Sequence, residues 1–96
     1  LLFLAILFIF SVISTILLYY SYGELRQKHG EAVNNLDYWE KVVRDYPTSP
    51  DGYYNAAIFA GILGEKQKAL DYLDKALKLD PGFEDAKELE RQIVNR

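Results

Sequence analysis

The stretch that decides the fold is Gly64–Pro81, which reads GEKQKALDYLDKALKLDP. Its apolar residues recur at intervals of three and four, the spacing at which side chains share one face of an α-helix. Two small residues, Ala69 and Ala76, stand seven apart on that face with Leu73 between them. Small side chains let a second helix cross closely. We therefore predict a helix over residues 66–79 that packs tightly against a neighbouring helix.

Helical patterns continue on both sides of this segment. Ser49-Pro50-Asp51 has the features of an N-cap, a first-turn proline and a first-turn acid, and Gly64 those of a C-cap, which predicts a helix over Pro50–Leu63. Asp80-Pro81-Gly82 is a break, after which residues 83–95 predict a last helix with a charged outer face. No stretch alternates with a period of two, so we expect an all-α fold without strands.

A 34-residue spacing relates Pro47 to Pro81 and Gly30 to Gly64. This is the period of the tetratricopeptide repeat, a helix–turn–helix unit, and Pro50–Pro81 resembles one complete repeat of that family. The resemblance implies a short array of helical hairpins, closed by the last helix as a cap. The residues that carry the resemblance are Tyr53, Ala56, Ala57, Ala60, Gly64, Ala69, Leu73, Ala76 and Pro81.

Projecting the same period upstream gives a degraded first repeat. Asn35 and Val42 depart from its two small positions. Its first helix would be the end of the N-terminal hydrophobic segment, which predicts one continuous helix of about 29 residues, a turn, and then a second helix up to Pro47. The marker residues of this repeat are Gly23, Gly30 at the turn, Trp39 and Pro47.

The N-terminal segment differs in composition from the rest of the chain. Residues 1–23 hold none of the 25 charges, and 18 of them are hydrophobic. An uncharged apolar run of about 20 residues is long enough to cross a bilayer as a helix. We divide the chain into a hydrophobic membrane or filament-core helix, 1–23, and a tetratricopeptide-like domain, 24–96. The residues expected to make the helix surface are Leu2, Leu4, Ile6, Phe8, Ile9, Ile13, Ile16 and Leu17.

Composition excludes most kinds of chemistry. The chain has no cysteine and a single histidine, His29, so neither a metal site nor a thiol nucleophile is expected. The net charge of −3 without a basic block argues against nucleic-acid binding. No glycine-rich phosphate loop occurs. We therefore expect a non-enzyme with no cofactor and no small-molecule substrate.

Two functions are compatible with these features. The resemblance to tetratricopeptide repeats implies binding of a peptide or helix in a groove, whose residues here would be Tyr54, Ile58 and Ile62. A hydrophobic helix leading into a small head also resembles the plan of type IV pilin-like subunits, and the start at Leu1 without Met fits a processed subunit. The favoured expectation is a homo-oligomeric extracellular filament at the cell surface, with lipid as the partner before assembly. The alternative is a single-pass membrane-anchored adaptor that recruits a membrane-associated protein.

Overall fold

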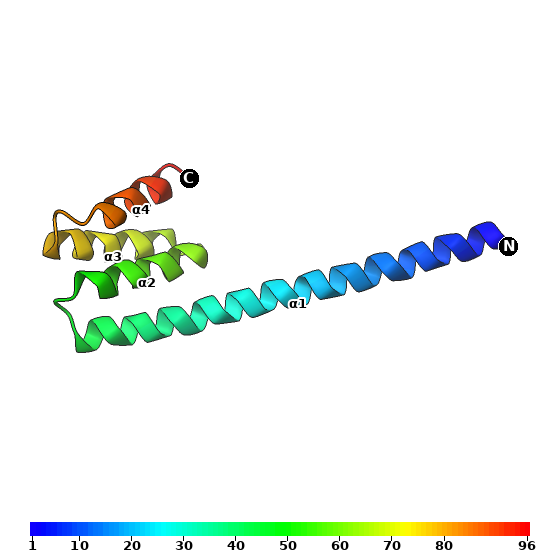
Figure 1. The fold of residues 1–96 in the computed structure, drawn as a ribbon, viewed down its shortest axis with the longest axis horizontal. Coiled ribbons are helices and arrows are strands. Elements are labelled where there is room, and N and C mark those ends of the chain that lie inside the picture. Colours follow the sequence, from blue (N-terminus) through cyan, green and yellow to red (C-terminus); the bar gives the residue numbers. More distant parts are fainter. The chain divides into compact units, whose positions relative to one another are not determined.

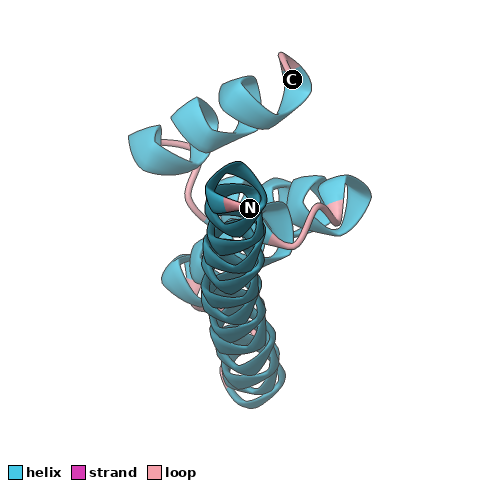
Figure 2. Ribbon diagram, turned by 90° about the vertical axis from the view of Figure 1, so that its right-hand side faces the viewer, coloured by secondary structure: helices cyan, strands magenta, loops and turns pink.

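The computed structural model describes all residues 1–96 and consists of four α-helices joined by short loops (Figure 1). Helices and loops account for the whole chain, with no strand (Figure 2). The predicted all-α fold is therefore confirmed, with a long N-terminal helix followed by short helices. The helices are α1 (Leu2–Asp45), α2 (Pro50–Ile62), α3 (Lys66–Leu79) and α4 (Glu84–Val94).

The chain forms two compact units, Leu1–Gly30 and Glu31–Arg96. Helix α1 contributes its first two-thirds to the first unit and its last turns to the second. The charged part of the sequence begins at Glu24, but the packed unit begins at Glu31. Packing therefore starts several residues after the change in composition.

The ends of α2 have the physical causes that the sequence indicated. The side chain of Ser49 accepts a hydrogen bond from the backbone N–H of Gly52, 3.4 Å away, and Pro50 occupies the first turn. At the other end Gly64 has a φ of 76°, the left-handed conformation that glycine adopts without steric cost. The N–H of Gly64 then bonds to the carbonyl of Gly61 at 3.1 Å. The N–H of Glu65 donates a hydrogen bond to the carbonyl of Ala60, 2.9 Å away.

The predicted helix over residues 66–79 matches α3 at both ends. Helix α2 ends one residue before the predicted Leu63, which is its C-cap. Helix α4 lacks the predicted terminal residues Phe83 and Asn95, which are its N-cap and C-cap. Differences of one residue are the usual fraying of a helix end.

The turn predicted at Gly30 is wrong. Helix α1 passes through Gly23 and Gly30 without a break, and Gly64 is the only glycine with a positive φ. A glycine inside a helix costs only about 1 kcal/mol relative to alanine, so it does not end a helix that strong helix formers continue on both sides. The degraded first repeat therefore has no hairpin, and its expected first helix does not fold back.

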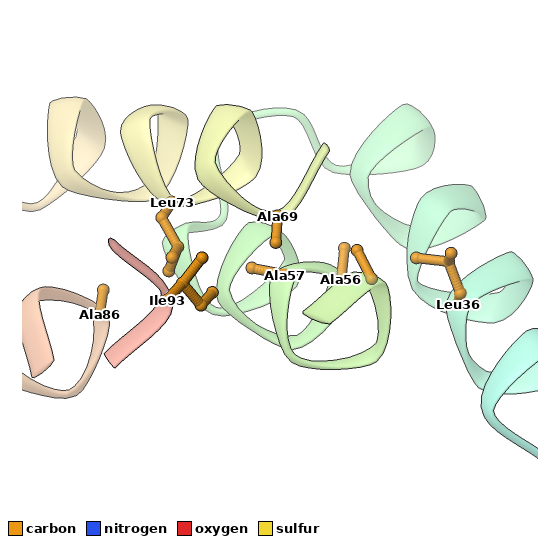
Figure 3. Close-up of a cluster of buried hydrophobic side chains, with 8 residues drawn as sticks. Leu36, Ala56, Ala57, Ala69, Leu73, Ala86 and Ile93 are labelled. Atoms are coloured by element: carbon orange, nitrogen blue, oxygen red, sulfur yellow. The ribbon is translucent and has the colours of Figure 1, made fainter. Parts of the chain in front are cut away.

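The core of the second unit is built mainly from small residues. Ala57 of α2 and Ala69 of α3 lie opposite each other, and Leu73 fills the space beside them (Figure 3). Leu36 from α1 joins the same cluster, as do Ala86 and Ile93 from α4. The alanines let the helix axes approach closely, so the three short helices and the end of α1 share one core.

Candidate functional site

The predicted repeat-packing residues occupy the interface between α2 and α3 and its two ends. Six of them are fully buried: Ala56, Ala57, Ala60, Ala69, Leu73 and Ala76. Tyr53 is half-buried, whereas Gly64 and Pro81 lie exposed in the loops at the ends of the two helices. These positions form the scaffold that orients the outer faces of α2 and α3.

Tyr53 links the loop before α2 to α3. Its hydroxyl donates a hydrogen bond to the carbonyl of Pro47 at 3.0 Å. Its ring lies 6.2 Å from the ring of Tyr72, and the Lys75 Nζ lies 5.8 Å and 5.9 Å from the two ring centres. The ammonium group is therefore within the range of a cation–π interaction with both rings. These contacts hold side chains of α2 and α3 together on the surface of the helix pair.

A polar cluster joins α1 to α3. The Tyr72 hydroxyl donates a hydrogen bond to Glu40 Oε2 at 2.5 Å, and the Lys68 Nζ lies 3.5 Å from Glu40 Oε1. Burial and the hydrogen bond to the Glu40 carboxylate raise the pKa of Tyr72 well above its ordinary value. Burial alone lowers the pKa of Lys68, but attraction to Glu40 and Glu65 outweighs it and leaves that pKa raised. The cluster is structural, because all its charges are satisfied within the unit.

The predicted groove residues on α2 differ in how open they are. Tyr54 and Ile58 are half-buried, whereas Ile62 is 63% exposed. The ring of Phe83, just before α4, lies 5.0 Å from the ring of Tyr54. Sequence reasoning missed this contact, although a lone aromatic residue directly after the Pro-Gly break was the available signal. Ile62 is therefore the most exposed of the three predicted groove residues.

The marker residues of the degraded first repeat do not come together. Gly23 and Gly30 are exposed, and an added Cβ at either would meet no atom within 4 Å. Pro47 is exposed and Trp39 is half-buried against the core, edge-to-face with Tyr38. The residues of α1 that are buried in the second unit are Ala32, Leu36 and Val43.

In the first unit, every residue from Leu1 to Gly30 is exposed. The eight residues predicted to form its hydrophobic surface are between 48% and 81% exposed. By length and composition, α1 is a candidate membrane-spanning helix. The Thr15 hydroxyl donates to the carbonyl of Ser11 at 2.9 Å, so this polar group is satisfied within the helix.

No group of three or more His, Cys, Asp or Glu side chains is placed to hold a metal ion. A hollow of about 110 Å³ lies between the α2–α3 turn and the end of α4, lined by Gly61, Gly64, Lys66, Ile93 and Arg96.

Parts of this chain are similar in sequence to known proteins. Tetratricopeptide repeat protein 21A of Homo sapiens is 33% identical over 76 residues, which are 79% of this chain and 6% of that protein. Protein CTR9 homolog of Arabidopsis thaliana is 35% identical over 63 residues, 66% of this chain and 6% of that protein. The chain thus spans only a small part of the length of these curated relatives. No solved structure matches it. Residues 50–83 match the tetratricopeptide repeat family, so the chain contains one such repeat, formed by α2, α3 and the loop that follows.

Proposed function

We propose that this chain is a membrane-anchored protein-interaction module without enzymatic activity. Its first unit crosses a bilayer, and its second unit presents the tetratricopeptide repeat to a protein partner. The observation that carries the proposal is the fully exposed, uncharged segment 1–23, because such a surface needs an apolar environment. The repeat supports the second half of the proposal, since units of this kind generally bind proteins.

The dimensions of the first unit fit a bilayer. Residues 1–22 span roughly 33 Å at about 1.5 Å per residue, and the hydrocarbon core is about 30 Å thick. Tyr19, Tyr20 and Tyr22 lie at the end of this stretch, just before the first charge at Glu24. Tyrosine favours the boundary between lipid and water, because its ring is apolar and its hydroxyl polar. We therefore place one membrane boundary at these tyrosines.

The recruiting surface of the second unit centres on Ile62. A single exposed isoleucine in reach of the half-buried Ile58 gives an apolar contact without a charged clamp. This surface suits an apolar side chain of a partner peptide or helix more than a free carboxylate. A photo-crosslinking amino acid at position 62 tests it, and Asp74 on α3, which is exposed and pairs with Lys78, gives a matched control position.

A pilus-like filament is the second candidate. Its specific support is that bulky side chains are exposed along the whole of residues 1–18, so neighbouring copies could cover them as lipid does. The pilin-like resemblance finds no counterpart among the known proteins that match this chain. Lipid covers the helix without requiring any contact between copies. The anchor is therefore the simpler proposal, and the filament is decided by experiment.

Membrane fractionation with electron microscopy separates the two functions. The anchor predicts that the full chain stays in the pellet after carbonate extraction, that detergent releases it, and that negative-stain images of detergent-free fractions show no fibres. A variant lacking residues 1–22 is expected to be soluble and to keep the circular dichroism of the second unit. Regular fibres in the detergent-free fraction would establish the filament instead. Release by carbonate without fibres would contradict both functions.

A further inference from the structure

We propose that one side of α1 in the second unit is a docking face for an amphipathic helix of a partner protein, with basic residues along its flanks. The face consists of Glu31, Asn35, Tyr38, Trp39, Val42 and Asp45. This proposal deepens the interaction role proposed above by naming a second surface and the chemistry of its occupant.

The internal repeat shows what covers a face of this kind. Shifting by 34 residues relates Asn35 to Ala69, Trp39 to Leu73 and Val42 to Ala76. The three residues of α3 are fully buried, and the alanines of α2 lie against this helix (Figure 3). A helix of small residues therefore covers this side of α3.

The equivalent side of α1 has no such cover. Asn35 is exposed, and Trp39 and Val42 are half-buried. Helix α1 continues without a break through Gly30, so the turn that the repeat pattern expects between two helices at this position is absent. Trp39 packs against the core of the second unit and Val42 lies near Gly52 at the start of α2, so each of them offers only the exposed part of its side chain to the face. The second unit thus contains one helix of a second hairpin, and the other helix of that hairpin is absent.

The side chains of the face are of the kind that binds proteins. Residues 31, 35, 38, 42 and 45 are spaced by three and four, so they form one stripe along the helix. Tyr38 is 58% exposed and lies edge-to-face with Trp39 at 5.1 Å. Tyrosine and tryptophan are enriched among the residues that dominate binding energy at interfaces. An incoming helix therefore needs small residues opposite Trp39, as α2 has opposite α3.

The acidic residues of the face favour a partner helix with basic residues on its flanks. Glu31 and Asp45 stand at the two ends of the stripe, and neither forms a salt bridge. Lys41, one helical turn before Asp45, and Arg44, directly before it, pair with neither acid. Fourteen residues of helix separate the two acids, or roughly 21 Å, which is about the length of a 14-residue helix. Lys or Arg at both ends of such a helix would complement the acids, which steers association and fixes orientation.

Fluorescence anisotropy on the full chain in lipid nanodiscs tests the docking face. The probe is a labelled synthetic peptide of residues 49–63, which contains the alanines of α2, with Asp51→Lys and Ile62→Lys so that a lysine stands near each end. We expect saturable binding that Tyr38→Ala weakens by about tenfold, because truncating a central aromatic side chain typically costs that much. The control Asp37→Lys, exposed on the same helix but off the stripe, should leave the affinity within about twofold.

A charge swap decides whether the acids select the partner. The double variant Glu31→Lys/Asp45→Lys should lose at least about tenfold affinity for the basic peptide and gain affinity for a peptide carrying Ile62→Glu with Asp51 retained. No saturable binding, or equal binding by Tyr38→Ala and the control, would overturn the docking face. Sedimentation that shows a dimer with wild-type sequence and a monomer with Tyr38→Ala would identify a second copy as the occupant and overturn the partner helix. None of these variants changes residues 1–23, so carbonate extraction tests the anchor separately.

Discussion

At the scale of single residues, two glycines with the same place in the 34-residue period have different roles. Gly64 adopts a φ of 76° and closes α2, whereas Gly30 is an ordinary helical residue. The sequence around Gly64 also includes the first-turn signals of the preceding helix and the break at Pro81, which together predicted its turn. Gly30 has only its spacing in its favour, and spacing alone does not change the conformation of a glycine flanked by helix formers.

This difference predicts opposite effects of the same substitution. Gly64→Ala should lower the free energy of unfolding by about 1–2 kcal/mol, because an alanine Cβ is strained at positive φ. Gly30→Ala should leave stability unchanged or raise it by about 0.5–1 kcal/mol, because the Cβ meets open space and reduces the entropy of the unfolded chain. Urea unfolding followed by circular dichroism measures both. A loss of stability with Gly30→Ala would mean that this residue is in a turn after all.

Tyr72 gives a prediction in alkaline solution. Burial and the hydrogen bond to Glu40 raise its pKa above the ordinary value of 10.0, so the folded state favours the neutral phenol. The stabilisation is complete below about pH 10 and is lost as the pH rises toward the raised pKa. Tyr72→Phe should cost about 1–2 kcal/mol at neutral pH, since the hydrogen bond to a carboxylate is lost.

The difference between wild type and Tyr72→Phe should then shrink above about pH 10, where the wild type loses its advantage. Urea midpoints at about pH 8 and pH 10.5 measure this difference. Tyr53→Phe is the matched control, because it removes a hydrogen bond to a backbone carbonyl instead of a carboxylate. A difference that stays constant with pH would exclude the coupling between Tyr72 and Glu40.

At the scale of elements, the sequence specified what depends on local periodicity and end signals. The three short helices were predicted to within one residue at each end, because their caps and breaks lie next to the helical pattern. The contact of Phe83 with Tyr54 was signalled only by an aromatic residue directly after the Pro-Gly break, because its partner depends on where the loop after α3 returns. The absence of the first hairpin was also not predictable from the sequence, because it depends on whether a long helix breaks at Gly30.

The close α2–α3 crossing predicts the effect of a large residue at Ala69. Ala69 is fully buried opposite Ala57, so Ala69→Trp should lower the free energy of unfolding by at least about 1–3 kcal/mol through overpacking. Thermal melting of the full chain in detergent measures this loss, and Ile62→Trp at an exposed position of α2 is the control. Equal melting temperatures for the wild type and Ala69→Trp would contradict the packing of the repeat.

At the scale of the whole molecule, the chain combines a unit that needs apolar surroundings with a unit that has its own core. No residue of the first unit is buried, whereas the second unit buries at least one alanine from each of the four helices, together with Leu36, Val43, Leu73 and Ile93. The uncharged composition of residues 1–23 calls for an apolar cover, which either lipid or neighbouring copies can supply. Both supply apolar contacts, so the difference lies in how each tolerates a charge.

Ile9→Asp separates these two covers. Fourteen Leu, Ile, Phe and Val residues lie within residues 1–18, each contributing about 0.3–0.6 kcal/mol to membrane insertion, whereas one Asp costs about 2.5–3.5 kcal/mol. Insertion therefore stays favourable, and the variant should still sediment with membranes after carbonate extraction. A filament core has no water to solvate the same carboxylate and no cation in residues 1–23 to pair with it, so any fibres of the wild type should disappear. Loss of the variant from the membrane pellet, with Ile9→Leu retained, would show that the segment is not held as a spanning helix.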